Sequence, residues 1–127
     1  MNIDKNARYR TSHEFARKDG AEIVAGISDH AQESLGDIVF VELPAVGKTL
    51  KQGEAFGVVE SVKAASDLYM PMSGKITAVN GDLEGDPALV NKDCYNKGWM
   101  IRFTPTNPSE WDGLLDAAAY EKEAGKE

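Results

Sequence analysis

Apolar and polar residues alternate with a period of two on both sides of residue 63, and this pattern is typical of β-strands. The first run covers residues 54–62 and the second covers residues 67–70. The short segment between them favours a β-hairpin with Lys63 at or near its tip. The turn contains no glycine and no Asn-Gly pair, so the hairpin is predicted from the strands alone.

The same alternation predicts strands in the rest of the chain. Asp19-Gly20 is a turn signal and places a second hairpin near the N-terminus. The strand expected at residues 37–43 has apolar residues at 38–41 and 43, which predicts that it is covered on both faces. The other strands expected are residues 22–27, 49–50, 75–80 and 99–103.

Two short helices are predicted between these strands from their end signals. Ser28 is a favourable N-cap and Gly36 a favourable C-terminal residue for a helix at residues 29–35. The irregular segment 81–93 is expected to hold one helical turn, with Asp86 as its cap and Pro87 at its first position.

The C-terminus changes from strand to helix periodicity. Asn107, Pro108 and Glu110 form a helix-start signal. Residue 113 is a glycine that can divide the segment into two helices, and the charged tail at 121–127 is expected to fray. The residues expected on one apolar helical face are Trp111, Leu114, Leu115, Ala118 and Ala119.

A short internal repeat suggests the architecture. Leu43-Pro44-Ala45-Val46-Gly47-Lys48 returns as Met70-Pro71-Met72-Ser73-Gly74-Lys75. Each repeat has too few strands to bury its own apolar face, so the two repeats are expected to pack together. The predicted fold is mainly β with flanking short α-helices, a flattened antiparallel barrel or sandwich with pseudo-two-fold symmetry and a C-terminal helix.

Length and charge narrow the range of functions. The chain has 127 residues, which suits one domain over residues 1–127, with a core at about 9–104 and a C-terminal helical segment at about 107–124. A net charge of -7 argues against nucleic acid and anionic membranes as partners. No apolar run is long enough to span a membrane. The first residues resemble neither a secretory signal nor a transit peptide, so a cytoplasmic location is the default.

Candidate catalytic and metal-binding groups are few. His13 and His30 have no metal-ligand spacing, and no nucleophile or phosphate-loop motif is present. The acidic run at 82–86 lacks the calcium-loop pattern. Cys94 is the single cysteine and can form no internal disulfide. No metal site is expected.

Lys63 carries the candidate chemistry. An amine on a rigid hairpin tip is accessible to a modifying enzyme, and acylation would attach a mobile group to it. A dithiol or biotin carrier would need this arrangement. A Schiff-base enzyme is the rival interpretation, but it needs a lysine desolvated in a pocket. An ordinary surface lysine is the third.

Several motifs together resemble a known family, the H protein of the glycine cleavage system. The resemblance covers about residues 9–120. Its most specific part is the block Glu60-Ser61-Val62-Lys63-Ala64, whereas biotin carriers favour Met-Lys-Met. The other matching segments are Ser12-His13-Glu14, residues 26–32, residues 35–44, Asn91-Lys92-Asp93 with Tyr95, and residues 98–101.

The resemblance implies a lipoyl/biotinyl-type barrel-sandwich hybrid and a carrier that is not an enzyme. Lipoate would be joined by an amide to Lys63. The arm would take an aminomethyl group from the P protein, a pyridoxal-phosphate glycine decarboxylase, to the T protein, an aminomethyltransferase. The L protein, a dihydrolipoamide dehydrogenase, would then reoxidise the arm. The alternative is a relay that donates lipoyl groups to 2-oxoacid dehydrogenase domains.

The resemblance also implies site residues. The loaded arm would fold back into a cleft formed by Ser12, Glu14 and Asp67. Ser12 and Glu14 are two residues apart, so on an extended segment they would face the same way. Glu60 lies three residues before Lys63, and its carboxylate is expected to meet a basic surface on the lipoylating enzyme. We expect a monomer.

Overall fold

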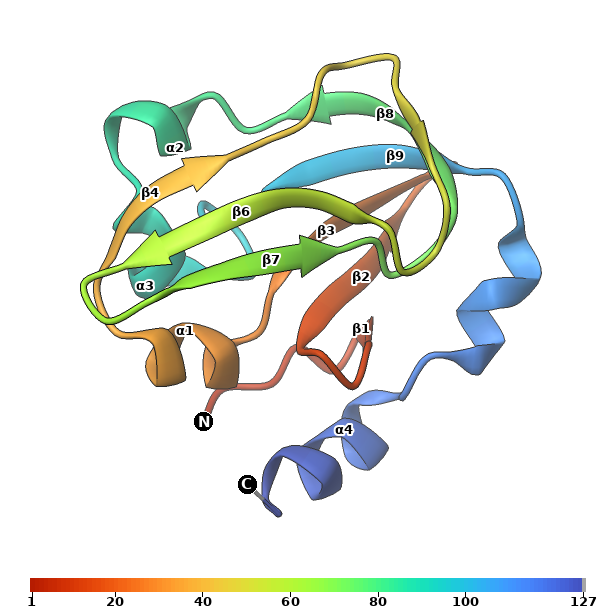
Figure 1. Cartoon of the computed structure of the whole chain (residues 1–127). Coiled ribbons are helices and arrows are strands. Elements are labelled where there is room, and N and C mark those ends of the chain that lie inside the picture. Colours follow the sequence, from red (N-terminus) through yellow and green to blue (C-terminus); the bar gives the residue numbers. More distant parts are fainter. Residues whose placement is uncertain (127) are drawn as a thin grey trace.

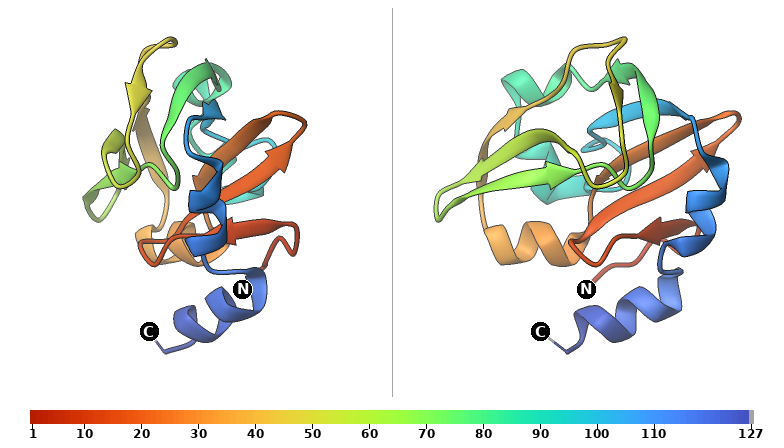
Figure 2. Two further views of the ribbon diagram at one scale, coloured as in Figure 1. Left: turned by 90° about the vertical axis from the view of Figure 1, so that its right-hand side faces the viewer. Right: turned by 45° about the vertical axis from the view of Figure 1, so that its right-hand side comes forward.

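Two antiparallel β-sheets pack face to face in the computed structural model, which describes residues 1–126 (Figures 1 and 2). The larger sheet contains, in spatial order, β1 (Ala7–Tyr9), β2 (Glu14–Asp19), β3 (Glu22–Ile27), β9 (Ile101–Pro105), β8 (Gly74–Val79) and β5 (Thr49–Leu50). The smaller sheet contains β4 (Ile38–Glu42), β6 (Ala55–Ser61) and β7 (Ala65–Tyr69), with β6 in the centre. The fold is the predicted mainly β sandwich with short flanking helices.

The main core lies between the two sheets. Period-two alternation turns Val41, Val59 and Leu68 of the smaller sheet inward, where they belong to one buried cluster with Ile76 and Phe103 of the larger sheet. A second cluster is half aromatic and includes residues of β1, β2 and the C-terminal helix. Its buried aromatic members are Tyr9, Phe15, Tyr95 and Tyr120.

The repeated segments lie next to each other, as the repeat predicts. β5 and β8 pair antiparallel, with Thr49 opposite Lys75. The pairing extends into the turn before β5, because Gly47 N donates to Ile76 O of β8 and Ile76 N donates to Lys48 O, at 2.8 and 2.9 Å. This reciprocal pairing is what an approximate two-fold axis between the repeats would produce.

The first helix and both predicted hairpins are confirmed. α1 spans Asp29–Leu35, and Ser28 Oγ accepts a hydrogen bond from Ala31 N at 3.1 Å. Gly36 ends the helix with φ +80°, a conformation that glycine adopts readily. β1 was not predicted. It pairs with β2 and also exchanges backbone hydrogen bonds with Leu115, so its existence depends on the distant C-terminal segment.

The prediction that the strand at 37–43 is covered on both faces is wrong. β4 is an edge strand of the smaller sheet, and Val39 and Phe40 are 54% and 49% exposed. The pairing of β4 with β6 shifts between Ile38 and Phe40, which places a bulge at Val39. The apolar character of this strand is therefore not explained by burial.

The predicted helical turn at Asp86 and Pro87 is also wrong. The segment holds two short helices, α2 (Asp82–Gly85) and α3 (Leu89–Asp93). Asp86 ends the first helix, because its N–H donates to Asp82 O.

The C-terminal segment divides at residue 113, as Gly113 suggested. A 3-10 helix spans Pro108–Gly113 and α4 spans Ala117–Ala124. Asn107 makes no side-chain capping bond, and Glu110 instead accepts hydrogen bonds from Ser73 N and Oγ.

The expectation of a single apolar helical face on this segment fails. Leu114 has extended backbone angles, so Leu114 joins the main core and Leu115 the second cluster. Fraying from residue 121 is wrong as far as Ala124, which is helical and 3% exposed, while Glu127 lies outside the described residues. Within residues 1–126, no helix is long and apolar enough to cross a membrane.

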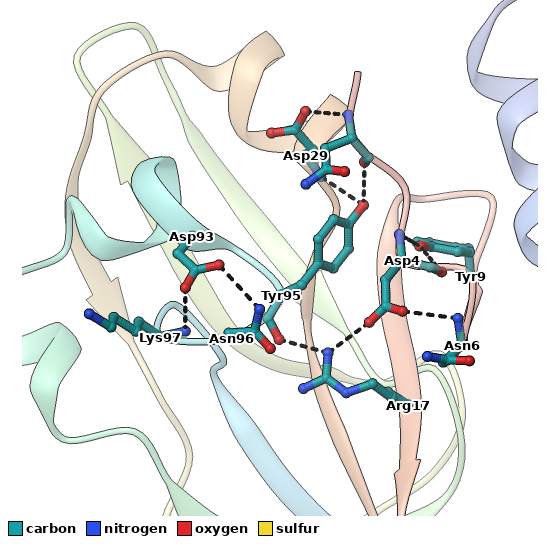
Figure 3. A network of polar contacts seen from close by, with 10 residues as sticks. Asp4, Asn6, Tyr9, Arg17, Asp29, Asp93, Tyr95, Asn96 and Lys97 are labelled. Atoms are coloured by element: carbon teal, nitrogen blue, oxygen red, sulfur yellow. Dashed lines mark hydrogen bonds and ion pairs between the residues drawn. The ribbon is translucent and has the colours of Figure 1, made fainter.

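A polar network fixes the N-terminal segment to the larger sheet (Figure 3). Arg17 donates to Asp4 Oδ2 at 2.9 Å and to Tyr95 O at 2.7 Å. Tyr95 Oη in turn donates to Asn2 O, and Asn2 N donates to Asp29 Oδ2. We call these five residues the N-terminal network. It connects the chain start to β2, α1 and the segment after α3.

Candidate functional site

Lys63 lies at the tip of the β6–β7 hairpin, as predicted, and its side chain is exposed. The strands pair from Ala55 opposite Tyr69 up to Glu60 opposite Ala65, next to the turn. Figure 1 shows the tip projecting at the left edge of the molecule, beyond α1. Within the described part of the chain, no hydrogen bond or ion pair engages Lys63 Nζ.

Ser61 makes this turn rigid without a glycine. Its Oγ accepts hydrogen bonds from Lys63 N at 3.1 Å and Ala64 N at 3.2 Å, and it donates to Ala64 O at 3.2 Å. A serine side chain that satisfies the turn's backbone groups replaces the usual turn signature. No residue of the tip needs a positive φ. Ser61 was not singled out from the sequence.

The tip of the hairpin is held by the loop between α1 and β4. Val62 N donates to Asp37 O at 3.0 Å. The Lys63 side chain passes over Gly36, where an added Cβ would lie 3.4 Å from Lys63 Cε. Asn91 of α3 supports this loop, because its Nδ2 donates to Gly36 O and its Oδ1 accepts from Ile38 N, both at 2.9 Å. The tip is therefore anchored while the amine stays accessible.

Ser12 and Glu14 are in contact, as expected for the pair. The Ser12 hydroxyl donates a short hydrogen bond to Glu14 Oε1. Glu14 Oε2 accepts from Tyr69 N at 2.9 Å, which ties the pair to the end of β7. Arg10 Nε lies 3.8 Å from Glu14 Oε1 and donates to Ser12 Oγ at 2.9 Å.

The reason for the Ser12–Glu14 contact differs from the one expected. Residues 11–13 form a turn, and His13 has φ +81°, which is rare for a side chain other than glycine. His13 is held in this conformation by a hydrogen bond between its Nδ1 and Tyr120 Oη at 2.7 Å. Tyr120 Oη also bonds Ser28 Oγ at 2.6 Å, so α4 helps to position the Ser12–Glu14 pair.

Burial sets the electrostatics of Glu14. Its side chain is 2% exposed, and this desolvation raises the pKa of the carboxyl group above its ordinary value. The hydrogen bonds from Ser12 and Tyr69 N and the charge of Arg10 oppose the increase. The carboxyl group thus accepts two hydrogen bonds in a poorly solvated position, where a cationic amine would relieve the cost of its charge.

Asp67 and Glu60 lie on the outer face of the smaller sheet and are exposed. Asp67 is two residues before Tyr69 on β7, so it stands between Lys63 and the Ser12–Glu14 pair along the strand. Ala65 and Tyr69 are about 13 Å apart at the ordinary rise of a strand. Glu60 is directly opposite Ala65, beside the tip.

The described residues form no second candidate site for metal binding or for nucleophilic catalysis by a cysteine. Among residues 1–126, no group of three or more His, Cys, Asp or Glu side chains could hold a metal ion. Cys94 is 5% exposed, and burial, with nearby Asp29 and Asp93, raises the pKa of its thiol to about 12. A thiol of this kind is not a nucleophile at neutral pH.

The structure is a two-sheet sandwich built from paired repeats, and it presents an exposed lysine on an anchored hairpin. These features together define the class of lipoyl- and biotinyl-type carrier domains. Comparison with known proteins identifies the family. The family model described as "Glycine cleavage H-protein" matches residues 7–127.

Individual relatives agree with the family match. The chain is 53% identical over 125 residues to a "Glycine cleavage system H protein" from Laribacter hongkongensis, covering 98% of each chain. A protein of the same name from Myxococcus xanthus is 50% identical over 119 residues, covering 94% of this chain and 92% of the relative. The crystal structure of a glycine cleavage system H protein from Mycobacterium marinum superimposes with a TM-score of 0.88 at 40% identity, covering 97% of this chain and 99% of that one.

The chain belongs to the glycine cleavage H-protein family. It is a lipoyl-carrier component of the glycine cleavage system and not a catalyst. The fold is the lipoyl-type barrel-sandwich fold.

Proposed function

We propose that Lys63 is the lipoyl attachment site and that the protein carries an aminomethyl group from the P protein to the T protein, with reoxidation by the L protein. The observation that supports this most is the exposed Lys63 amine on a hairpin whose backbone is fixed by Ser61 and Asp37. We further propose that the carrier acts as a monomer in the cytoplasm.

The residues around Lys63 fit a covalently bound lipoyl group. Attachment requires an amide bond between the lipoyl carboxyl carbon and Nζ. An activated acyl donor loses its leaving group, and the amine loses its proton. Within residues 1–126 no contact holds Nζ, so no interaction has to be broken first. Once bound, a lipoyl group would supply a reducible disulfide at the end of a long flexible chain.

Ser12, Glu14 and Asp67 would retain the cationic cargo. β7 is an edge strand, and it leads from the Lys63 turn to Tyr69, whose N–H contacts Glu14. An arm that folds back along β7 would pass the Asp67 carboxylate and end near the Ser12–Glu14 pair. The buried carboxylate of Glu14 would bind the amine and limit its exposure to water.

Lys63→Arg tests the attachment site. Arginine keeps the charge and approximate length of the side chain but has no acylatable amine. We expect no lipoyl adduct by intact mass after treatment with lipoate–protein ligase, lipoate and ATP, while the wild type gains one. We expect the melting temperature to stay within about 1 °C, because an exposed tip contributes little to stability. A lipoyl adduct on the Lys63→Arg protein would overturn the assignment.

A further inference from the structure

The edge of the smaller sheet beside Lys63 exposes large apolar side chains that the core does not bury. Val62 is 67% exposed at the tip, and Val39 and Phe40 are about half exposed on β4. Phe40 lies directly opposite Glu60, and Val62 N contacts Asp37 O, so these side chains flank the same end of the hairpin. Exposed apolar groups that cluster in this way mark interaction surfaces.

The outer face of this sheet is also strongly acidic. Strand pairing aligns Glu42, Val58 and Asp67 in one row and Phe40, Glu60 and Ala65 in the next. Residues opposite each other in a sheet share a face, so three carboxylates surround Phe40 and Val58. We call Phe40, Glu42, Val58, Glu60 and Asp67 the carrier face.

The charges on the carrier face are not neutralised within the protein. For the part of the chain that the structure describes, no ion pair includes Glu42, Glu60 or Asp67. β4, β6, β7 and their hairpin contain one cation, Lys63 itself. A partner with lysine or arginine side chains around an apolar pocket would complement this surface.

The short reach of the unmodified Lys63 side chain indicates which partner covers the carrier face. A bare lysine extends only roughly 6 Å from its backbone by ordinary bond lengths. The enzyme that acylates Lys63 must bring its acyl carbon to that amine, so its surface has to touch the hairpin and its flanks. Enzymes that act on the end of a loaded arm can stay farther away. Phe40 is opposite Glu60, which lies three residues before Lys63, so Phe40 falls inside an interface that includes the tip.

We infer that Phe40, with Val39 and Val62, anchors the enzyme that lipoylates Lys63 in an apolar pocket bordered by basic side chains. This inference rests on the proposed function and extends it from the modified residue to the docking surface. The bulge at Val39 turns an edge-strand side chain outward, which gives the enzyme a shape to recognise as well as a charge.

The test measures acylation kinetics on unmodified protein with lipoate–protein ligase, lipoate and ATP. We expect Phe40→Ser to raise KM by roughly ten-fold or more, as loss of an aromatic interface anchor does, with kcat nearly unchanged. Val46→Ser is the matched control, because Val46 is 59% exposed but lies in the turn after β4, away from the tip. Equal KM values for the two variants would overturn the inference.

Deuterium exchange on the wild type keeps the test independent of any folding defect in Phe40→Ser. We expect the ligase to protect residues 38–42 and 60–64 but not 44–48. If the ligase does not protect residues 38–42, the inference is overturned. It is also overturned if these residues become protected without ligase as the protein concentration rises, because a second copy of the chain would then cover this edge. If the ligase does not acylate wild-type Lys63, the proposed function fails; if it does and Phe40→Ser reacts like the wild type, only the docking surface fails.

Discussion

The N-terminal network and the carrier face both present charged side chains, but only the first pairs them. In the network, Arg17 bonds Asp4 and a backbone carbonyl, and both side chains are about one-fifth exposed. On the carrier face, Glu42 and Glu60 are exposed without an ion pair in residues 1–126.

The aromatic residues of the two regions differ in the same way. Tyr95 of the network is 5% exposed, whereas Phe40 of the carrier face is 49% exposed. Paired charges and buried rings stabilise the fold, while unpaired acids around an exposed ring contribute little to it. Side chains that do not stabilise the protein, yet cluster beside the exposed Lys63 amine, are available for binding.

The largest expected effect on stability is in the network. Arg17→Met leaves Asp4 Oδ2 and the Tyr95 carbonyl without the hydrogen bonds that Arg17 donates, in a partly buried position. We expect the free energy of unfolding to fall by about 2–3 kcal/mol, measured by urea denaturation, with the lipoylation rate unchanged.

Glu42→Gln is the matched change on the carrier face. We expect it to alter the free energy of unfolding by less than about 0.5 kcal/mol. If the two substitutions destabilise the protein equally, the distinction between the regions is wrong.

The Ser12–Glu14 pair lies at the border between the two regions, since Glu14 is buried but contacts the edge of β7. Glu14→Ala should leave lipoylation intact and shorten the retention of the aminomethyl cargo. A charge-assisted hydrogen bond contributes about 1.5–3 kcal/mol, so release without T protein should accelerate by roughly ten-fold or more.

The rate of formaldehyde and ammonia release from loaded protein measures this effect. Ser34→Ala, an exposed change on α1, is the control and should release cargo at the wild-type rate. Equal release from Glu14→Ala and the control would show that Glu14 does not protect the cargo.

The pH dependence of stability tests the burial of Glu14 separately. Because its pKa is raised, the folded protein keeps this proton to a higher pH than the unfolded chain does. The contribution of Glu14 to stability therefore becomes less favourable as pH rises from the ordinary carboxyl range through the raised pKa.

Glu14→Gln removes this titration. Relative to wild type, its free energy of unfolding should increase between pH 4 and pH 8, because only the wild type has to lose a proton from a buried carboxyl group. Urea denaturation at several pH values provides the measurement. Parallel pH profiles would contradict the raised pKa.

The smallest expected effect is that of one charge on the carrier face. Glu60→Gln should slow lipoylation by about two- to three-fold at low salt and less at physiological salt, because screening weakens the attraction between exposed charges. Initial rates across a salt series check this, and a rate independent of both the mutation and salt would exclude Glu60 as a contact.

The sequence predicts the Lys63 hairpin well because period-two alternation is a local signal. It predicts α1 for the same reason, since Ser28 and Gly36 act within one turn of the helix. Features that depend on distant residues were missed. The contact between Glu14 and Tyr69 N joins residues 55 apart, and His13 takes its conformation with the help of Tyr120, 107 residues away.

The error on β4 has a different physical origin. Apolar side chains in a strand indicate burial, but the sequence does not say whether the protein's own core or a partner covers them. Val39 and Phe40 were predicted to lie in the core because a strand covered by the core and a strand covered by a partner have the same apolar pattern. The short helices after β8 were misplaced because packing against other elements, more than end signals, decides so short a segment.

The buried Cys94 has a consequence for the chemistry of the proposed arm. A carrier whose cargo cycles between disulfide and dithiol forms is exposed to thiol–disulfide exchange, which begins with attack by a thiolate. The single cysteine is enclosed, and a thiol pKa of about 12 leaves almost none of it ionised at neutral pH. A lipoyl arm on Lys63 would therefore meet no competing thiolate from its own protein at neutral pH.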